Sequence, residues 1–313
     1  LVGATGAGMI WRAAAAISAG LCHTCLCLTG ATREQRPEGG GRTGWGGMRD
    51  NSPYGEFEVP YGAIGANFGY AQVAMRYAYE YGCKPEQLAK IAVDQRHNAC
   101  ANPDAMFHGQ PITIEDVLNS PVVVDPLHLL EIVMPTAGAA AVLVTSAERA
   151  KGAKGMKNNP AYLLGAGERC THKALTYAPS LTDTAVAAAA ATAFEMSGVW
   201  PQDIGLASIY DCYTITALLT LEDAGFCGKG EGGKFVWDHD LRYGGDFPVN
   251  THGGQLSFGQ PGLAGGMSHV TEAARQLQGR AGERQVNGLE FAYVNCNGGI
   301  MSEQVSLILG RNP

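Results

Sequence analysis

Charged residues are scarce in this chain, and those present lean acidic. Only 16% of the 313 residues are charged, and 22 lysines and arginines face 29 aspartates and glutamates, for a formal net charge of -7 at pH 7. Nucleic-acid affinity depends on clustered cations that neutralise phosphates. No such cluster stands out here, which argues against DNA or RNA as the main partner.

Long apolar runs are also lacking. The alanine-rich segment 186–193 is only weakly apolar and far shorter than the roughly 20 residues that a membrane-spanning helix needs. The start of the chain has no charged leader region, and Arg12 interrupts its alanine run. We therefore expect no membrane span, no signal peptide and a cytoplasmic location.

A regular disulfide pattern is missing as well. Nine cysteines occur at irregular positions, and an odd number at this length is typical of free thiols in a reducing compartment. The stretch Cys22-His23-Thr24-Cys25-Leu26-Cys27 superficially resembles a metal cluster. No second Cys/His pair at ligand spacing accompanies it, so we interpret 21–28 as a buried strand and expect no metal in this chain.

What the chain does have is 43 glycines, 46% hydrophobic residues and two cycles of alternating strands and helices. This alternation predicts an α/β fold with a largely parallel sheet. The predicted helices are 9–19, 63–81, 85–101, 183–197, 216–224 and 267–279; the predicted strands are 21–29, 139–145, 162–168, 206–210, 289–295 and 305–310.

The two cycles suggest two related halves packed together. We place the first at 1–158, with an inserted polar loop at 32–62, and the second at 159–313. Loops as long as 32–62 usually bind a partner or substrate, and its part 53–62 is a candidate lining for an acyl pocket. Because residue 1 falls inside a glycine turn, we expect further strands of the first half to precede it.

Four small-residue turns carry the functional signal. They are GATGAG (3–8), SIYDCYT (208–214), NTHGGQLSFGQPGLAGG (250–266) and YVNCNGG (293–299). Together they resemble the thiolase superfamily, and most closely its sterol-carrier and lipid-transfer branch of acyl-CoA enzymes. The segment MPTAGAAAVLVTS (134–146) is similar to that family's DGAAAV segment. The resemblance implies a five-layered αβαβα fold and a homodimeric core.

The departures from the family pattern matter as much as the matches. The position of the family's nucleophilic cysteine falls on Gly3, the histidine of its GHP segment on Gln260, and its oxyanion-hole His or Asn on Tyr210. The C-terminal cysteine of the family is kept as Cys296, and His252 is an added imidazole. Without a thiol at position 3, an acyl-enzyme step is not available.

The remaining groups suit a reaction that needs only oxyanion binding and proton transfer. Retro-aldol cleavage of a β-hydroxyacyl-CoA through a thioester enolate is such a reaction. The lipid-transfer-type retro-aldolases of steroid acyl-CoA look similar in lacking the cysteine and in carrying CGKGE (227–231) and NTHGGQL (250–256) segments. Tyr210 matches one of their two proton-transferring tyrosines, and the other falls on Gln260.

The predicted site therefore contains Tyr210 with His252 as its helper, Gln260 as a donor to the thioester oxygen, and Cys296. The turns at Gly3, Gly298 and Gly299 are expected to bind the oxyanion or substrate. Lys229 lies in a glycine loop without full phosphate-binding spacing. We interpret Asp211 as orienting its turn, and Tyr70 and His269 as packing or surface residues.

The resemblance also implies a partner. In this branch the thiolase-like subunit commonly works with a small zinc-ribbon/OB-fold acyl-CoA-binding protein, so zinc is expected there, and the loop 32–62 is a candidate docking surface. We expect no cofactor in this chain beyond the coenzyme A thioester substrate. Two alternatives remain open: a thiolase-type acyltransferase acting on a β-ketoacyl-CoA through Cys296, or a non-catalytic acyl-CoA-binding scaffold.

Overall fold

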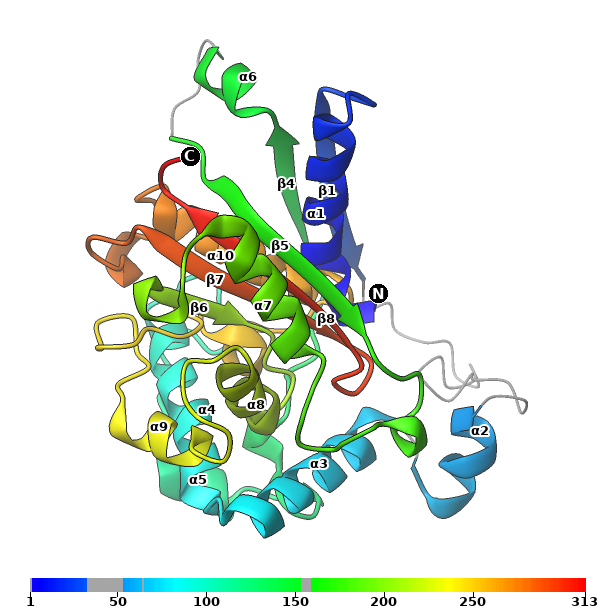
Figure 1. The fold of residues 1–313 in the computed structure, drawn as a ribbon. Helices are drawn as coiled ribbons and strands as arrows, with labels where there is room; N and C mark the ends of the chain where they lie inside the picture. The colour runs from blue at the N-terminus through cyan, green and yellow to red at the C-terminus, as the bar shows by residue number, and fades with distance from the viewer. Residues whose placement is uncertain (1, 33–52, 64, 153–158) are drawn as a thin grey trace.

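The computed structural model describes residues 2–32, 53–63, 65–152 and 159–313. A four-stranded sheet runs through the centre of the molecule (Figure 1). Its strand order is β5-β8-β7-β6. The strands are β5 (Tyr162–Cys170), β6 (Leu206–Ile209), β7 (Phe291–Gly298) and β8 (Glu303–Gly310).

The prediction of a largely parallel sheet is wrong. Only β6 and β7 run parallel, whereas β7/β8 and β5/β8 are antiparallel. The reason is local: β7 and β8 are joined by the short turn 299–302, and a connection that short can only reverse the chain. The parallel pair β6/β7 nevertheless positions part of the predicted site, because two of its four turns, 208–214 and 293–299, lie at the carboxyl ends of these strands.

Helices cover both faces of this sheet. On one face, α7 (Val186–Ser197) packs so closely on β5 that a β-carbon at Gly165 or Gly167 would collide with the helix carbonyls of Ala193 and Ala189. On the other face lie α1 (Thr5–Ser18) and α10 (Ala264–Leu277). Their N-termini meet at glycines, since a β-carbon at Gly6 would overlap the backbone of α10.

Beyond α1 and α10 lies a second sheet of two antiparallel strands, β1 (Thr24–Ala31) and β4 (Gly138–Thr145). The molecule thus shows four successive layers, α7, the central sheet, α1 with α10, and β1 with β4 (Figure 1). Within the described ranges, no helix covers the outer face of β1 and β4 as the predicted fifth layer.

The interpretation of 21–28 as a buried strand is wrong for its outward face. Leu26 and Leu28 are 66% and 58% exposed, as is their neighbour Leu143 at 64%, while Cys27 faces inward and is buried. The alternation follows from the two-residue period of a strand with one covered face. All nine cysteines are free, and the sulfurs of Cys22 and Cys25 lie 3.2 Å apart.

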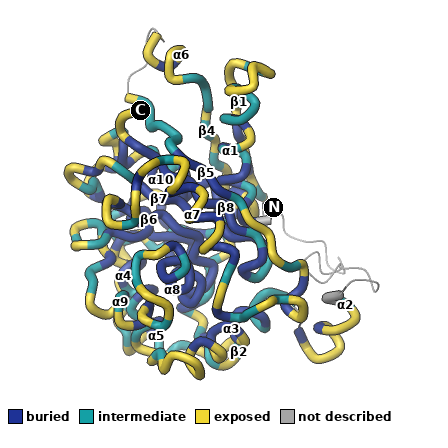
Figure 2. Tube along the Cα trace, in the orientation of Figure 1, coloured by how far each residue is buried: buried dark blue, intermediate teal, exposed yellow. Residues whose placement is uncertain are grey.

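The helix α8 (Thr214–Asp223) is buried at every residue except Asp223 (Figure 2). It contacts α7 and also α3 (Ala66–Tyr81), α4 (Pro85–Cys100) and α9 (Gly232–Asp238). Next to α3 and α4 lie α5 (Ile114–Asn119), β2 (Val122–Val124) and β3 (Leu127–His128). By contrast, α6 (Ala147–Gly152) follows β4 at the end of the second sheet, and α2 (Pro53–Phe57) lies at the periphery (Figure 1).

The helix boundaries follow their sequence signals within a few residues. Gly20, Gly82 and Gly198 adopt positive φ directly after or near the ends of α1, α3 and α7, as expected for C-terminal glycines. Most of the predicted loop 32–62 lies outside the described residues. Its described end, 53–61, forms α2 and a helical turn. None of the helices described in the structure is long and apolar enough to cross a membrane.

Candidate active site

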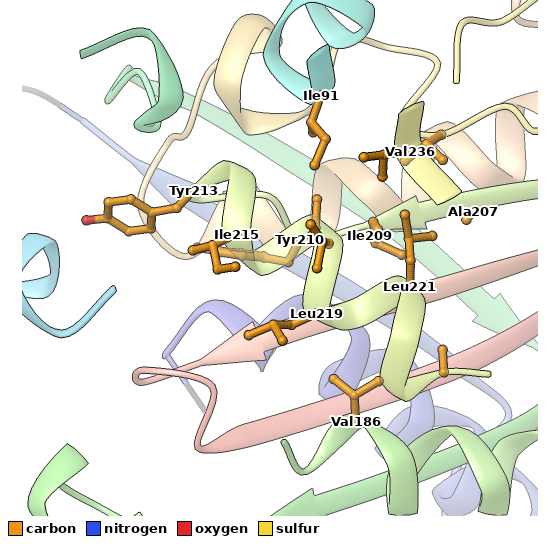
Figure 3. Packing of buried hydrophobic residues seen from close by; sticks show 14 of the residues in the cluster. Ile91, Val186, Ala207, Ile209, Tyr210, Tyr213, Ile215, Leu219, Leu221 and Val236 are labelled. Carbon is orange, nitrogen blue, oxygen red and sulfur yellow. The ribbon is translucent and has the colours of Figure 1, made fainter. Parts of the chain in front are cut away.

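Tyr210 lies at the carboxyl end of the parallel pair β6/β7. Its backbone N–H donates to the Asn295 carbonyl at 2.9 Å, which extends the pairing by one residue before the chain turns into α8. The side chain is only 5% exposed, and Figure 3 shows it among cluster residues such as Ile209 and Ile215. Burial raises the pKa of the Tyr210 phenol above its ordinary value of 10.0, so the phenol is neutral at physiological pH.

The Tyr210 hydroxyl occupies the space beside Gly3. A β-carbon at position 3 would lie 2.6 Å from both Cζ and Oη of Tyr210, and closer still to the Asn297 carbonyl. Real β-carbons do not approach other atoms that closely, so a side chain at position 3 and the phenol of Tyr210 exclude each other. The glycine at position 3, which supplies no nucleophile, is therefore what leaves room for the phenol of Tyr210.

Gln260 holds the Tyr210 phenol from the adjacent glycine loop. Its amide Nε2 donates to Tyr210 Oη at 3.2 Å and to the Gly262 carbonyl at 3.3 Å. Its backbone is fixed in turn, because Gln260 N donates to the Met134 carbonyl at 2.8 Å. Both amide hydrogens of Gln260 thus serve contacts within the protein, which favours a role in holding Tyr210 over direct donation to a thioester.

Asp211 shapes the same loop from the other side. Its carboxyl oxygens accept from the backbone N–H groups of Gln255 at 2.8 Å and Leu256 at 3.2 Å. These residues belong to a π-helical turn, Gly254–Phe258, a conformation that often occurs at functional sites. Gly254 adopts positive φ there, and a β-carbon on it would collide with Asp211. Asp211 therefore orients the loop that presents Gln260.

His252 does not reach Tyr210. Its Nε2 lies 3.3 Å from Ser268 Oγ, and the ring is 2% exposed. Burial, with smaller contributions from Arg284 and Arg275, lowers the pKa of His252 to about 3. The imidazole that lies next to Tyr210 is His269 instead: the two ring centroids are 6.0 Å apart, and His269 is fully buried.

Cys296 faces the N-terminus of α1. Its thiol donates to the Gly266 carbonyl at 3.2 Å, and it is completely buried. Burial raises the pKa of Cys296 to about 12, although a hydrogen bond from the Ala7 backbone opposes this shift. The thiol is therefore protonated at neutral pH and is not a ready nucleophile.

The carbonyls of Gly298 and Gly299, at the turn after β7, accept hydrogen bonds from other side chains of the protein. Ser302 Oγ donates to the Gly298 carbonyl at 3.1 Å, and the Tyr70 hydroxyl donates to the Gly299 carbonyl at 2.8 Å. Tyr70 also accepts from Asn297 Nδ2 at 2.7 Å, and it is buried. Tyr70 therefore joins α3 to the predicted substrate turn. It packs in the core, as predicted, but directly beside the candidate site.

A cavity of about 620 Å³ lies next to the glycine-rich loop 250–266. Its walls include Pro261, which follows Gln260, together with Phe258 and Ser268 from the glycine loop and α10. The strand residues 138–141 also line this cavity. The described end of loop 32–62 borders a different, smaller cavity of about 280 Å³ with Phe57, Tyr61 and Leu175.

Lys229 belongs to a separate cluster. Its Nζ lies 2.8 Å from Asp223 Oδ1 and 3.3 Å from Glu222 Oε2, and it also donates to the Thr182 carbonyl. Glu222 accepts in addition from the Tyr77 hydroxyl and from the Gly232 backbone. The CGKGE segment thus joins α8 and α9 to the segment before α7, and its lysine is already neutralised. Among the described residues, no His, Cys, Asp and Glu side chains converge as a metal site.

Sequence reasoning did not assign Gln255 or His269 to the site, although His269 lies next to Tyr210 and Gln255 contacts His269. Gln255 Nε2 is 3.3 Å from His269 Nε2, and both residues are fully buried. The available signals were the glutamine that follows two glycines in GGQL and the histidine in GGMSH. Neither pattern by itself shows that the two side chains meet.

Comparison with known proteins identifies the family. The family of thiolase C-terminal domain-like proteins matches residues 167–311. A steroid side-chain-cleaving aldolase from Thermomonospora curvata is 34% identical over 99% of this chain and 79% of its own length. The chain belongs to the thiolase superfamily. The resemblance predicted from the four turns is confirmed.

Other members of the thiolase superfamily agree. A solved structure titled "Ltp2-ChsH2(DUF35) aldolase" superposes with a TM-score of 0.87 at 32% identity, covering 99% of this chain and 78% of that one. A 17-hydroxy-3-oxo-4-pregnene-20-carboxyl-CoA lyase from Mycobacterium tuberculosis is 36% identical over 83% of this chain and 66% of its own length. The predicted thiolase-like α/β fold is thereby confirmed.

The superfamily members that match include acyltransferases as well. An acetyl-CoA acetyltransferase from Methanothermobacter thermautotrophicus is 39% identical, but over 74% of this chain and only 59% of its own length. The chain thus spans less than two thirds of that relative. Membership alone therefore does not choose between lyase and transferase chemistry, and the division into halves at 158/159 stays a prediction.

Proposed function

We propose that this chain is a carbon–carbon lyase that cleaves a bulky, steroid-like β-hydroxyacyl-CoA by a retro-aldol step. The observation that carries the proposal is the phenol of Tyr210 in the space beside Gly3. Thiolase-type chemistry needs a thiolate there. A neutral, buried phenol supports proton transfer instead, and the aldolase and lyase relatives named above support the substrate class.

In the proposed step Tyr210 is a proton shuttle. The β-hydroxyl proton passes to Tyr210 Oη while the phenol gives its own proton to the α-carbon. The bond between the α- and β-carbons breaks, and its electron pair forms the thioester enolate that receives this proton. The products are a ketone and a shortened acyl-CoA, with no net change in protons and no need for free CoA.

Gln260 supports this role by holding the phenol oxygen. Its donated hydrogen bond to Tyr210 at 3.2 Å stabilises negative charge that develops on the oxygen during transfer. We assign His252, Cys296, Gly298 and Gly299 to the surroundings of the reacting groups, where they shape the glycine loop and the turn after β7.

We further propose that the chain acts as a homodimer together with a small acyl-CoA-binding protein. The solved relative whose title names both Ltp2 and ChsH2(DUF35) supports such a pairing. A zinc-ribbon in that partner and docking through loop 32–62 belong to the same proposal.

The proposal is tested by product analysis. The protein, with and without its acyl-CoA-binding partner, is incubated with a tertiary β-hydroxyacyl-CoA, and ketone release is followed by mass spectrometry. Ketone release without free CoA supports the lyase. Turnover only of a β-ketoacyl-CoA with added CoA would establish the transferase, and binding without turnover of either would establish a scaffold.

A further inference from the structure

Two thiols meet in the turn between α1 and β1, at the opposite end of α1 from Gly3. The sulfurs of Cys22 and Cys25 lie 3.2 Å apart, and both side chains are half-buried. Helix α1 has 14 residues, so at 1.5 Å of rise per residue this turn lies about 20 Å along the helix from the candidate active site. The proposed reaction therefore does not account for the two thiols.

Hydrogen bonds fix the backbone on both sides of this pair. The Leu21 N–H donates to the Ala16 carbonyl at 3.0 Å, where α1 ends. On the strand side, Thr145 Oγ1 of β4 donates to the His23 carbonyl at 2.9 Å and lies 3.2 Å from Thr24 Oγ1. The two cysteines are thus held near each other by contacts that do not use their own side chains.

This proximity favours a disulfide between the two cysteines. Once one thiol has formed a mixed disulfide with a small molecule, the neighbouring thiol can displace that molecule in an intramolecular step. Bonded sulfurs lie about 2 Å apart, so the two half-buried side chains have to close a gap of only about 1 Å. Cys27, on the same strand, offers a comparison, because it is 4% exposed and its thiol donates to the Met9 carbonyl at 3.7 Å.

We propose that Cys22 and Cys25 form a reversible redox modification site, a dithiol that small disulfides such as oxidised glutathione convert to an intramolecular disulfide. One cysteine attacks the S–S bond of the oxidant and releases the first small thiol; the second cysteine then attacks the mixed disulfide and releases the other. The two cysteine protons pass to the released thiols, and the oxidant takes up the electron pair. This site is independent of the proposed function.

The pH dependence of the exchange follows from the same contact. The hydrogen bond to Cys25 raises the pKa of Cys22 above its ordinary value of 9.0, so this thiol is protonated at pH 7. Because the thiolate is the attacking species, oxidation should become faster as the pH rises toward this pKa. A thiol of raised pKa is also a poor leaving group, which slows reduction of the disulfide once it has formed.

Peptide mass analysis tests the proposal. The reduced protein is incubated with excess oxidised glutathione, denatured, alkylated and digested with trypsin. Cleavage after Arg12 and Arg33 gives the peptide 13–33, whose three cysteines are Cys22, Cys25 and Cys27. The expected peptide has lost two hydrogens and carries a single alkyl group, on Cys27. Excess reduced glutathione should restore all three alkylation sites.

Three variants of the same peptide decide which thiols react. Cys22→Ser and Cys25→Ser should each abolish the loss of two hydrogens and leave the remaining thiol free or joined to glutathione. Cys27→Ser is the matched control and should keep the loss. A wild-type peptide that stays alkylated at all three cysteines would overturn the proposal. So would a loss that persists in Cys22→Ser or disappears in Cys27→Ser.

Discussion

Two buried polar clusters, both built from segments that stand out in the sequence, differ in one physical property. In the cluster around Tyr210, the side chains of Tyr210, Gln255, Gln260 and His269 are neutral at pH 7. The buried carboxyl of Asp211 lies 3.5 Å from His269 Nε2, and burial raises its pKa well above the ordinary value. The cluster around Lys229 is made of charges, with the carboxylates of Glu222 and Asp223 within 3.3 Å of the ammonium group. Both are held by glycine-rich loops.

This difference fits the proposal that the Tyr210 cluster takes part in catalysis, whereas the Lys229 cluster stabilises the fold. Buried charges must be paired, and the carboxylates of Glu222 and Asp223 both form ion pairs with Lys229, which connects α8 and α9 to the segment before α7. In the cluster around Tyr210 the Gln260 amide donates to the Tyr210 hydroxyl, and the Gln255 amide lies against His269. Changes in the Lys229 cluster should therefore alter stability, and changes in the Tyr210 cluster should alter turnover.

The largest effect is expected for Tyr210→Phe. Removing the hydroxyl removes the proposed proton shuttle, so kcat should fall by about 10³-fold or more, in the range seen for lost acid–base groups. Because the ring remains packed, substrate binding and the unfolding temperature should change little. Steady-state kinetics and calorimetry measure both, and retained turnover would show that Tyr210 is only a packing residue.

Gly3→Ala should be the next most severe change. The added β-carbon would overlap Tyr210 and the Asn297 carbonyl, so the phenol must move. We expect kcat to fall by about 10²-fold and the free energy of unfolding by about 2 kcal/mol from overpacking. Denaturant titration and kinetics give the two values. An alanine tolerated without loss of either would contradict the mutual exclusion of side chains at 3 and 210.

Lys229→Met should act on stability and leave turnover of the folded protein largely intact. It leaves the buried Glu222 without its cation, for a loss of about 3 kcal/mol. The matched control is Lys234→Met, which breaks the exposed pair with Asp238 and should change the free energy of unfolding much less, because exposed ion pairs contribute little to stability. Equal costs in urea unfolding would contradict the distinction between the clusters.

Cys296→Ala should lower kcat by less than about tenfold, through the packing defect alone. With a pKa near 12, the thiol does not supply a thiolate at neutral pH. Thiol alkylation should likewise spare lyase turnover. Loss of activity comparable to that of Tyr210→Phe would return Cys296 to the reaction and favour the acyltransferase alternative.

The smallest effect is expected from pH. The active form of Tyr210 is the neutral phenol, and its pKa is raised above 10.0 by burial. Below that folded-state pKa the proton is present, so kcat should stay level between about pH 7 and pH 9.5 and decline only at higher pH. A tenfold rise per pH unit in this range would instead indicate that the phenolate is the active form.

Local patterns predicted the elements well because they depend on neighbours in the chain. The helix 85–101 and the strand 139–145 are found as Pro85–Cys100 and Gly138–Thr145. The strand directions were not predictable in the same way, since alternation alone suggested parallel pairing. The helix α9 was not predicted either, because it begins with two glycines and its flanking segments resemble a loop, although one of its faces is buried.

The sequence predicted which residues belong to the candidate site better than it predicted which of them touch. Tyr210 and Gln260 were singled out and do touch, but the sequence suggested that Gln260 donates to substrate, whereas its donors are used within the protein. His252 was expected next to Tyr210, and His269 lies there instead. Which residue lies next to Tyr210 depends on contacts between residues 50 or more positions apart in the chain, and the spacing of motifs in one sequence does not predict such contacts.

The central claim is tested most directly by ketone release from a tertiary β-hydroxyacyl-CoA in the absence of free CoA, measured for the wild-type protein and for Tyr210→Phe with the acyl-CoA-binding partner present. The account predicts stoichiometric ketone and shortened acyl-CoA from the wild type and almost none from the variant. Ketone release unaffected by the substitution, or turnover that begins only when free CoA is added to a β-ketoacyl-CoA, would contradict it.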